Sequence, residues 1–160
     1  MKVKRVLFVC LGNICRSPAA EGIFKSKVQD RHLEPFLQID SAGTGDWHVG
    51  ELPDSRMRAA ARQRNYNLDS KARQFRSQDF YDFDLILAMD DSNYRNILQL
   101  KPKESEASKP LAQVKLMLDY HPEHRGENVP DPYYGGAAGF HHVLDLLEVA
   151  TEELLQELIK

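Results

Sequence analysis

The hydrophobic positions of this chain form short continuous runs, separated by longer segments in which apolar residues recur every three or four positions. Four runs are apolar enough for buried strands of a parallel sheet, whose two faces are both covered. They are Val3 to Val9, Phe36 to Ile39, Leu85 to Met89 and Val114 to Leu118. Helical segments alternate with these strands, and this alternation predicts an α/β fold with a parallel sheet.

The helical segments carry residues that favour helix starts. We expect helices from about 18 to 28, from 53 or 54 to 65, from 90 or 91 onward, and from 138 to 158. Ser17 is a favourable N-cap for the first helix, with Pro18 at its first position. In the third helix the spacing places Tyr94, Ile97 and Leu98 on one face.

The composition predicts an ordinary core and no strong electrostatic partner. The chain has 160 residues, 42% of them hydrophobic, and we expect a single domain over 1–160. A formal net charge of −3 is too small to indicate nucleic acid or an anionic membrane as the main partner. Two cysteines are too few for a disulfide scaffold and favour a reducing, cytoplasmic setting. A monomer is the default expectation.

The basic residues at the start, followed by an apolar run, superficially resemble a signal peptide. Gly12, Asn13 and Arg16 interrupt the run at once, and no small-x-small cleavage site follows. A buried first strand explains the pattern better, and no later segment is long enough to span a membrane.

The loop Cys10-Leu11-Gly12-Asn13-Ile14-Cys15-Arg16-Ser17 follows the first predicted strand, at the sheet edge where such folds bind ligands. The backbone N–H groups of a loop that opens a helix favour a bound anion. Gly12 and Asn13 supply backbone freedom, and the planar Arg16 guanidinium can hold two phosphate oxygens. We therefore predict that the loop residues, Leu11, Ile14 and Cys15 included, cradle a phosphate.

Cys10 lies inside this positive field, which favours its thiolate form. A thiolate below a phosphoryl group can attack in line, giving a phosphocysteine that water then hydrolyses. This chemistry needs no metal, and we expect no cofactor. The Ser17 hydroxyl can hydrogen-bond the sulfur as it departs. For Cys15, a structural thiol and a regulatory disulfide with oxidised Cys10 both remain open.

The reaction also needs an acid for the leaving oxygen, and Asp131 is the candidate. Pro130 and Pro132 fix the backbone on both sides of Asp131. Tyr133 and Tyr134 can flank an aromatic substrate ring, and Trp47 can close another side, although core packing is an alternative for Trp47. Without the Cys10 loop, the two prolines would indicate only a turn.

At these motifs the chain resembles the low-molecular-weight protein tyrosine phosphatases. The resemblance rests, in order along the whole chain, on 9–18, 40–43, Trp47 with Val49-Gly50, 71–73, 89–90 and 131–135. It implies a three-layer sandwich with a four-stranded parallel sheet flanked by helices and a phosphate-binding loop after the first strand. It also implies a two-step, metal-independent phosphatase acting on a phosphotyrosine-containing protein or peptide.

The resemblance implies roles for individual residues. Cys10 would be the nucleophile, Arg16 the phosphate binder and Asp131 the general acid. Asn13 and Ser41 would shape the loop through hydrogen bonds, and Asp90 would lie near the site. Some members carry a histidine where this chain has Ser70, so no role for a histidine is carried over to that position.

Two other functions remain as alternatives. An arsenate reductase on the same fold needs further cysteines to relay a disulfide, and this chain has only Cys15 beside Cys10. A phosphopeptide-binding module without catalysis would be expected to lack Cys10 or Asp131. The spacing of His121 and His124 suggests a metal, but no convincing partner ligands accompany it, and Arg16 would repel a cation from the two cysteines. We therefore expect no metal site.

Overall fold

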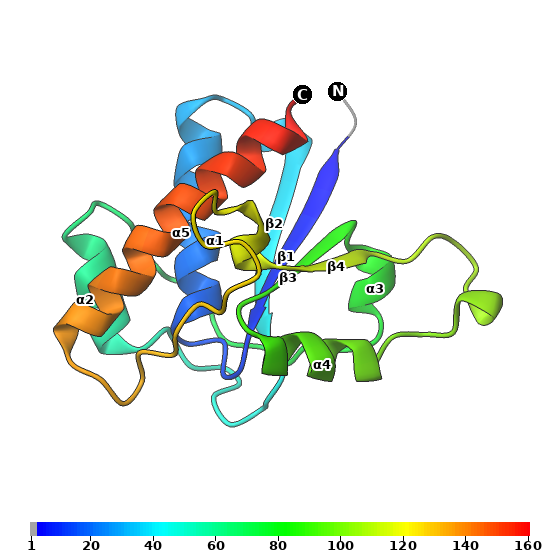
Figure 1. The fold of residues 1–160 in the computed structure, drawn as a ribbon, viewed down its shortest axis with the longest axis horizontal. Helices are drawn as coiled ribbons and strands as arrows, with labels where there is room; N and C mark the ends of the chain where they lie inside the picture. Colours follow the sequence, from blue (N-terminus) through cyan, green and yellow to red (C-terminus); the bar gives the residue numbers. More distant parts are fainter. Residues whose placement is uncertain (1–2) are drawn as a thin grey trace.

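The computed structural model describes residues 3–160 and contains a four-stranded sheet in the order β2-β1-β3-β4 (Figure 1). The strands are β1 (Lys4–Cys10), β2 (Leu37–Gly43), β3 (Leu85–Ala88) and β4 (Gln113–Leu116). Every neighbouring pair is parallel. The predicted parallel sheet is confirmed.

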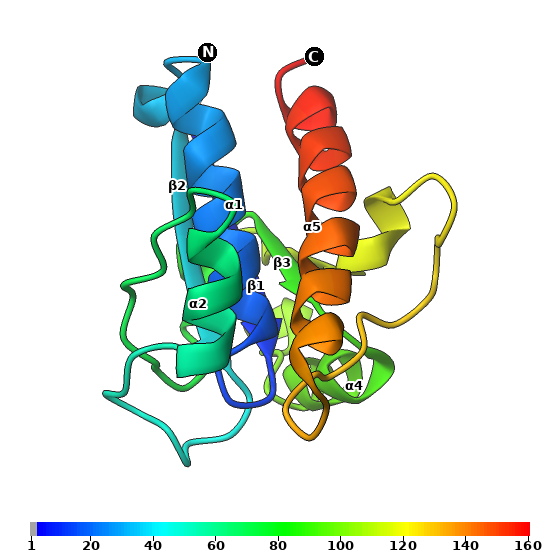
Figure 2. The ribbon, with the colours of Figure 1, turned by 90° about the vertical axis from the view of Figure 1, so that its left-hand side faces the viewer.

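Helices cover both faces of the sheet. They are α1 (Arg16–Asp30), α2 (Ser55–Arg62), α3 (Asp79–Asp82), α4 (Asp91–Gln99) and α5 (Ala137–Leu158). Short 3-10 turns lie at Glu34–Phe36, Glu104–Glu106 and Met117–Tyr120. Helices α1, α2 and α5 lie together on one face, and α3 and α4 lie on the other (Figures 1 and 2). The predicted three-layer sandwich is confirmed.

The alternating side chains of β1 divide the core into two parts. Val6 and Phe8 pack with the apolar residues of α1 and α5. Leu7 and Val9 point to the opposite face and pack with the apolar residues of α3 and α4. All four side chains are completely buried, as expected for a strand covered on both faces.

The bounds of all four strands differ from the prediction, most of all those of β2 and β4. β2 begins at Leu37 and continues to Gly43, well past the predicted end at Ile39, while Phe36 lies in a 3-10 turn. The polar Asp40 and Ser41 concealed this half of the strand, because their side chains find partners elsewhere in the fold. β4 ends at Leu116, since the following residues turn into a 3-10 helix. β1 and β3 differ from prediction by one residue at their ends.

The helix starts and ends also differ. α1 begins at Arg16 with Cys15 at the N-cap, so Ser17 does not cap the helix. Its hydroxyl lies instead beside the Cys10 sulfur. α2 begins after its N-cap Asp54 and ends at Arg62, three residues before Asn65. Asn65 has a φ of 68°, a left-handed conformation that does not continue a helix.

In α4, Asp90 is the N-cap, as its position suggested. The buried residues of this helix are Asn93 and Ile97, and Leu98, one position after Ile97, is 38% exposed. The four-residue α3 was not predicted, because one turn is too short to show a helical period. No helix within residues 3–160 is long and apolar enough to cross a membrane.

The parallel strands end at one edge of the sheet, and this edge positions the site. Cys10, the last residue of β1, pairs with Gly43, the last residue of β2. Asp90 follows two residues after the end of β3. The loop that leaves Cys10 therefore lies between two neighbouring strand ends.

Candidate active site

Three carbonyl oxygens of the loop after β1 are bonded to other parts of the chain. The carbonyls of Cys10, Leu11 and Ile14 accept hydrogen bonds from the N–H groups of Thr44, Gly45 and Asp54, at 2.9, 2.8 and 2.8 Å. Asn13 adopts a positive φ of 57°. Within the described part of the chain, the N–H groups of residues 11–15 donate to no protein acceptor, so they are free to bind an anion.

The two cysteines of the loop are buried free thiols. Cys10 is 2% exposed, and its Sγ lies 3.0 Å from Ser17 Oγ. Burial, reinforced by the negative charge of Asp54, raises the pKa of Cys15 far above its ordinary value. Cys15 is therefore a neutral thiol at any physiological pH.

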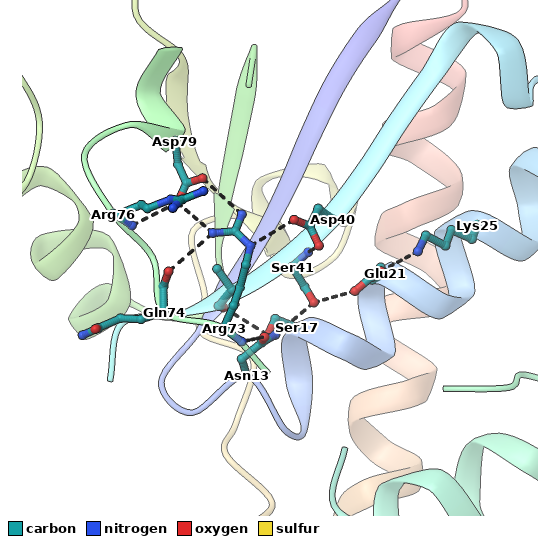
Figure 3. A network of polar contacts seen from close by, with 11 residues as sticks. Asn13, Ser17, Glu21, Lys25, Asp40, Ser41, Arg73, Gln74, Arg76 and Asp79 are labelled. Carbon is teal, nitrogen blue, oxygen red and sulfur yellow. Dashed lines mark hydrogen bonds and ion pairs between the residues drawn. The ribbon is translucent and has the colours of Figure 1, made fainter. Parts of the chain in front are cut away.

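A network of buried polar side chains joins the loop to β2 and α1 (Figure 3). The Asn13 amide nitrogen donates to Ser17 Oγ at 2.8 Å and to Ser41 Oγ at 2.9 Å. Ser41 Oγ donates to Glu21, which is paired with Lys25. The side chains of Asn13 and Ser17 thus bond to the loop's support, and only the backbone of these residues remains for a ligand.

Arg73 ties this network to the rest of the fold (Figure 3). Its backbone N–H donates to Asn13 Oδ1 at 3.0 Å. Its guanidinium bonds to Asp40 at 3.0 Å and to Asp79 at 3.1 Å. The 71–73 segment picked out in the sequence therefore acts through the Arg73 backbone on the loop.

Arg16 is buried, and two partners fix its guanidinium. Nη1 donates to Asp90 Oδ2 at 2.7 Å and to the Val129 carbonyl at 3.0 Å. Burial lowers the pKa of Arg16, but the negative charges of Cys10, Asp90 and Asp131 outweigh burial and raise it above its ordinary value. Arg16 is a permanent cation beside the Cys10 sulfur.

Asp131 lies on the other side of the cavity, on the segment between β4 and α5. Its Oδ1 accepts the Tyr133 N–H at 3.0 Å, and its Oδ2 lies 3.6 Å from Arg16 Nη2. The side chain is 41% exposed. One carboxyl oxygen is thus held by the backbone, and the other faces Arg16.

These residues surround one cavity of about 410 Å³, which is within the range of small-ligand sites. The lining residues are Cys10, Leu11, Gly12, Ile14, Cys15, Arg16, Trp47, His48, Asp131, Tyr133 and Tyr134. Trp47 and Tyr134 stand at the rim, 68% and 95% exposed. The alternative that Trp47 packs in the core is wrong.

Three contributors were not expected from the sequence. His48 lines the cavity and its Nδ1 lies 2.5 Å from Glu51. Glu21 and the Val129 carbonyl hold the loop and Arg16 from positions without a motif of their own. His48 follows Trp47 directly, and this adjacency was the one available signal.

Comparisons with known proteins agree over nearly the whole chain. A sequence model of the family described as low molecular weight phosphotyrosine protein phosphatase matches residues 5–160. A low molecular weight protein-tyrosine-phosphatase of Streptomyces coelicolor is 45% identical over 94% of this chain and 91% of its own length. A solved protein tyrosine phosphatase of Entamoeba histolytica superposes with a TM-score of 0.88 at 45% identity, covering 97% and 96% of the two chains. A drosophila arginine phosphatase superposes with a TM-score of 0.88 at 35% identity, covering 100% and 99%.

Proposed function

Because this chain belongs to the low molecular weight phosphotyrosine protein phosphatase family, we propose that it hydrolyses phosphotyrosine in proteins through a phosphocysteine on Cys10. The observation that carries the proposal is the cavity shared by Cys10, Arg16 and Asp131. Hydrolysis of a phosphate monoester by this route requires a nucleophile, an anion-binding cation and a proton donor in one place.

In the first step, the phosphate binds to the N–H groups of the loop and to the free side of the Arg16 guanidinium. The Cys10 thiolate attacks phosphorus, and the bond from phosphorus to the tyrosine oxygen breaks. Asp131 gives its proton to that oxygen from Oδ2, because Oδ1 is held by the Tyr133 N–H. Tyrosine leaves, and the phosphoryl group stays on sulfur.

In the second step, a water molecule attacks the phosphorus of the phosphocysteine, and Asp131 takes a proton from this water. The bond between phosphorus and sulfur breaks, and its electrons return to sulfur. The Ser17 hydroxyl, 3.0 Å from Sγ, is placed to donate to the departing thiolate. Inorganic phosphate is released, and the site returns to its starting state.

The rim of the cavity supports an aromatic substrate. Trp47, Tyr133 and Tyr134 are exposed side chains around an opening whose floor is Cys10. Aromatic rings there can stack on the phenyl group of phosphotyrosine. A phosphoserine would place its phosphate above the floor and leave these rings without a partner.

The proposal includes the cellular compartment and the oligomeric state of the enzyme. Two buried thiols without a disulfide suit a reducing compartment, and we assign the enzyme to the cytoplasm. We take the active unit to be a monomer, since one chain supplies the nucleophile, the cation and the acid.

The test is hydrolysis of phenyl phosphate and 2,4-dinitrophenyl phosphate in the presence of a chelator. Cys10→Ser is expected to be inactive. Asp131→Ala should lower kcat/KM for phenyl phosphate about 100-fold, and much less for the dinitrophenyl ester, whose leaving group needs no proton. Hydrolysis that survives in Cys10→Ser would overturn the mechanism.

Two further assays on the wild-type protein test the alternative functions, arsenate reduction and phosphopeptide binding without catalysis. Thiol-dependent reduction of arsenate would indicate the reductase, and phosphopeptide binding without turnover would indicate a binding module. Phosphoarginine is a further substrate to compare, because one structural neighbour is named an arginine phosphatase. A higher kcat/KM for phosphoarginine than for phosphotyrosine peptides would contradict the proposed substrate.

A further inference from the structure

The segment that carries Asp131 has few hydrogen bonds to the rest of the molecule. It is anchored at its start, where Val129 N–H donates to the Met89 carbonyl at 2.8 Å. From 130 to 136, the hydrogen bonds of the described structure are internal to the segment or lead into the first turn of α5. Apart from the ion pair of Asp131 Oδ2 with Arg16 Nη2 at 3.6 Å, the position of Asp131 is therefore set largely by side-chain packing.

Arg56, the second residue of α2, provides that packing from another element. Its Cζ lies 5.3 Å from the centre of the Tyr133 ring and 4.9 Å from the centre of the Phe140 ring. Both distances are within the range of a cation–π interaction. Arg56 thus contacts both the segment that carries Asp131 and the first turn of α5.

Asp54 holds the Arg56 guanidinium in this place. The Asp54 carboxylate accepts from Arg56 Nε at 3.0 Å and from Nη2 at 2.9 Å. Its hydrogen bonds with Arg56 keep the pKa of Asp54 below its usual value, so the carboxylate stays charged. A paired carboxylate restricts the planar guanidinium to one orientation.

Asp54 is also bonded to the phosphate-binding loop. Its backbone N–H donates to the Ile14 carbonyl at 2.8 Å. A continuous set of contacts therefore runs from Ile14 through Asp54, Arg56 and Tyr133 to Asp131. This set joins the loop that holds the nucleophile to the segment that holds the acid.

We propose that Arg56 is a positioning residue that holds Asp131 over the phosphate-binding loop by way of Tyr133. The inference rests on the proposed function, in which Asp131 protonates the leaving group. The Tyr133 N–H binds Asp131 Oδ1 and so sets the direction of Oδ2. When Arg56 no longer holds the Tyr133 ring, the segment shifts and Oδ2 leaves the line of the departing oxygen.

The test compares Arg56→Ala and Arg56→Lys with Arg58→Ala in the same helix. Within residues 3–160 the Arg58 guanidinium donates to the Pro53 carbonyl and has no hydrogen bond or ring contact with Tyr133 or Phe140. Arg56→Ala should lower kcat/KM for phenyl phosphate about tenfold, a part of the full contribution of a general acid. For 2,4-dinitrophenyl phosphate the loss should be less than about twofold, because its leaving group needs no proton. For phenyl phosphate, the kcat/KM of Arg56→Lys should lie between those of wild type and Arg56→Ala, and the kcat/KM of Arg58→Ala should match wild type.

The ratio of the two substrates is a readout that general damage to the fold does not change. Equal losses on both substrates, or no loss on phenyl phosphate, would overturn the inference. A loss seen with phosphopeptides alone would also overturn it, since Arg56 would then bind substrate.

A double variant separates this inference from the proposed function. In an Asp131→Ala background, Arg56→Ala should cause no further loss on phenyl phosphate, because the acid is already absent. A further tenfold loss there would contradict a role through Asp131. If Asp131→Ala itself shows no dependence on the leaving group, the proposed acid is wrong, whatever Arg56 does.

Discussion

Arg16 and Asp90 lie 74 positions apart and are joined by a 2.7 Å hydrogen bond at the end of the sheet. The other carboxylate oxygen of Asp90 accepts the Asn93 N–H at 2.7 Å and so caps α4. One carboxylate therefore orients the Arg16 guanidinium, the proposed phosphate binder, and begins a helix on the opposite face of the sheet. The Cys10–Ser17 loop and α4 are held as one unit.

The variant Asp90→Asn tests this link. Asparagine still caps α4, but the buried Arg16 loses the nearer of its two carboxylate partners and keeps Asp131 at 3.6 Å. We expect the free energy of unfolding to fall by about 2 kcal/mol. Inorganic phosphate should narrow the difference in Tm from wild type, because a bound anion replaces the lost charge. Thermal unfolding with and without phosphate measures both effects, and the exposed neighbour variant Asp91→Asn should match wild type. An unchanged Tm for Asp90→Asn would contradict the link.

The network in Figure 3 has a defined direction of hydrogen bonding. Ser41 gives its one hydroxyl hydrogen to Glu21, so it can only accept from Asn13. The other Asn13 amide hydrogen goes to Ser17. Ser17 is then left to donate its own hydrogen toward the Cys10 sulfur, 3.0 Å away, or the Ala42 carbonyl at 3.3 Å.

Glu21→Gln should disturb this direction, because a carboxamide can donate to Ser41 and turn its hydroxyl toward Asn13. We expect a loss of about 2 kcal/mol in stability, together with slower turnover of phenyl phosphate. Lys25→Met is the matched control. It removes only the half-exposed partner of Glu21 and should cost about 0.5 kcal/mol. Denaturant unfolding gives both values, and equal losses for the two variants would show that Glu21 matters only as an ion pair.

Gly43 is a point where the loop and β2 approach closely. A Cβ at this position would lie 2.8 Å from the Leu11 carbonyl oxygen and 2.9 Å from the Asn13 nitrogen, both backbone atoms. Gly43→Ala must therefore displace the loop, and we expect kcat/KM for phenyl phosphate to fall about 100-fold. Gly139→Ala places its Cβ in ordinary contact at 3.7 Å and should leave kcat/KM near wild type. Wild-type kinetics in Gly43→Ala would contradict this account.

The parts of the molecule that were predictable from the sequence are those whose cause is local. Leu85–Ala88 is apolar on every position because both sides of β3 are covered, and a continuous apolar run records that directly. The second half of β2 was missed because Asp40 and Ser41 are stabilised by Arg73 and Glu21, which are distant in sequence. A polar residue in a strand gives no local sign of such a partner.

The site shows the same division. The loop from Cys10 to Ser17 is contiguous, so the proposal that it binds an anion could be made from residue order alone. Ser17 was expected to cap α1 because serine favours that position, but the fold places its hydroxyl at Cys10 instead. The contacts of Arg56 with Tyr133 and Phe140 arise only when α2 packs beside α5, so the sequence carries no local sign of them.

Glu152 on α5 makes the packing of α5 against α1 sensitive to acid. The pKa of Glu152 is lowered to about 2, chiefly by a hydrogen bond from Gln156. Hydrogen bonds from Arg31 and Lys27, on the α1 side, lower this pKa further. As the pH falls, the unfolded chain takes up this proton near the ordinary pKa of 4.5, before the folded chain does. The contribution of Glu152 to stability is therefore present above pH 4.5 and lost as the pH falls toward 2.

The variant Glu152→Gln should lower stability by about 1 kcal/mol at pH 7, as for a partly exposed ion-pair network. The difference from wild type should shrink as the pH falls from 4.5 to 2. Urea unfolding over this range measures it, and Glu153→Gln, an exposed neighbour, is the control. A difference that stays constant with pH would contradict the lowered pKa of Glu152.

We expect Cys15 to capture an oxidised Cys10, since both thiols line the same cavity and are buried. Peroxide converts the Cys10 thiolate to a sulfenic acid, and the Cys15 sulfur then attacks it and releases water. Because burial raises the pKa of Cys15, this second step should become faster as the pH rises. Mass mapping after peroxide treatment should show a Cys10–Cys15 disulfide, and a thiol reductant should restore activity. In Cys15→Ser, the same peroxide treatment should cause a loss of activity that a thiol reductant does not reverse. Full recovery of Cys15→Ser would show that Cys15 has no protective role.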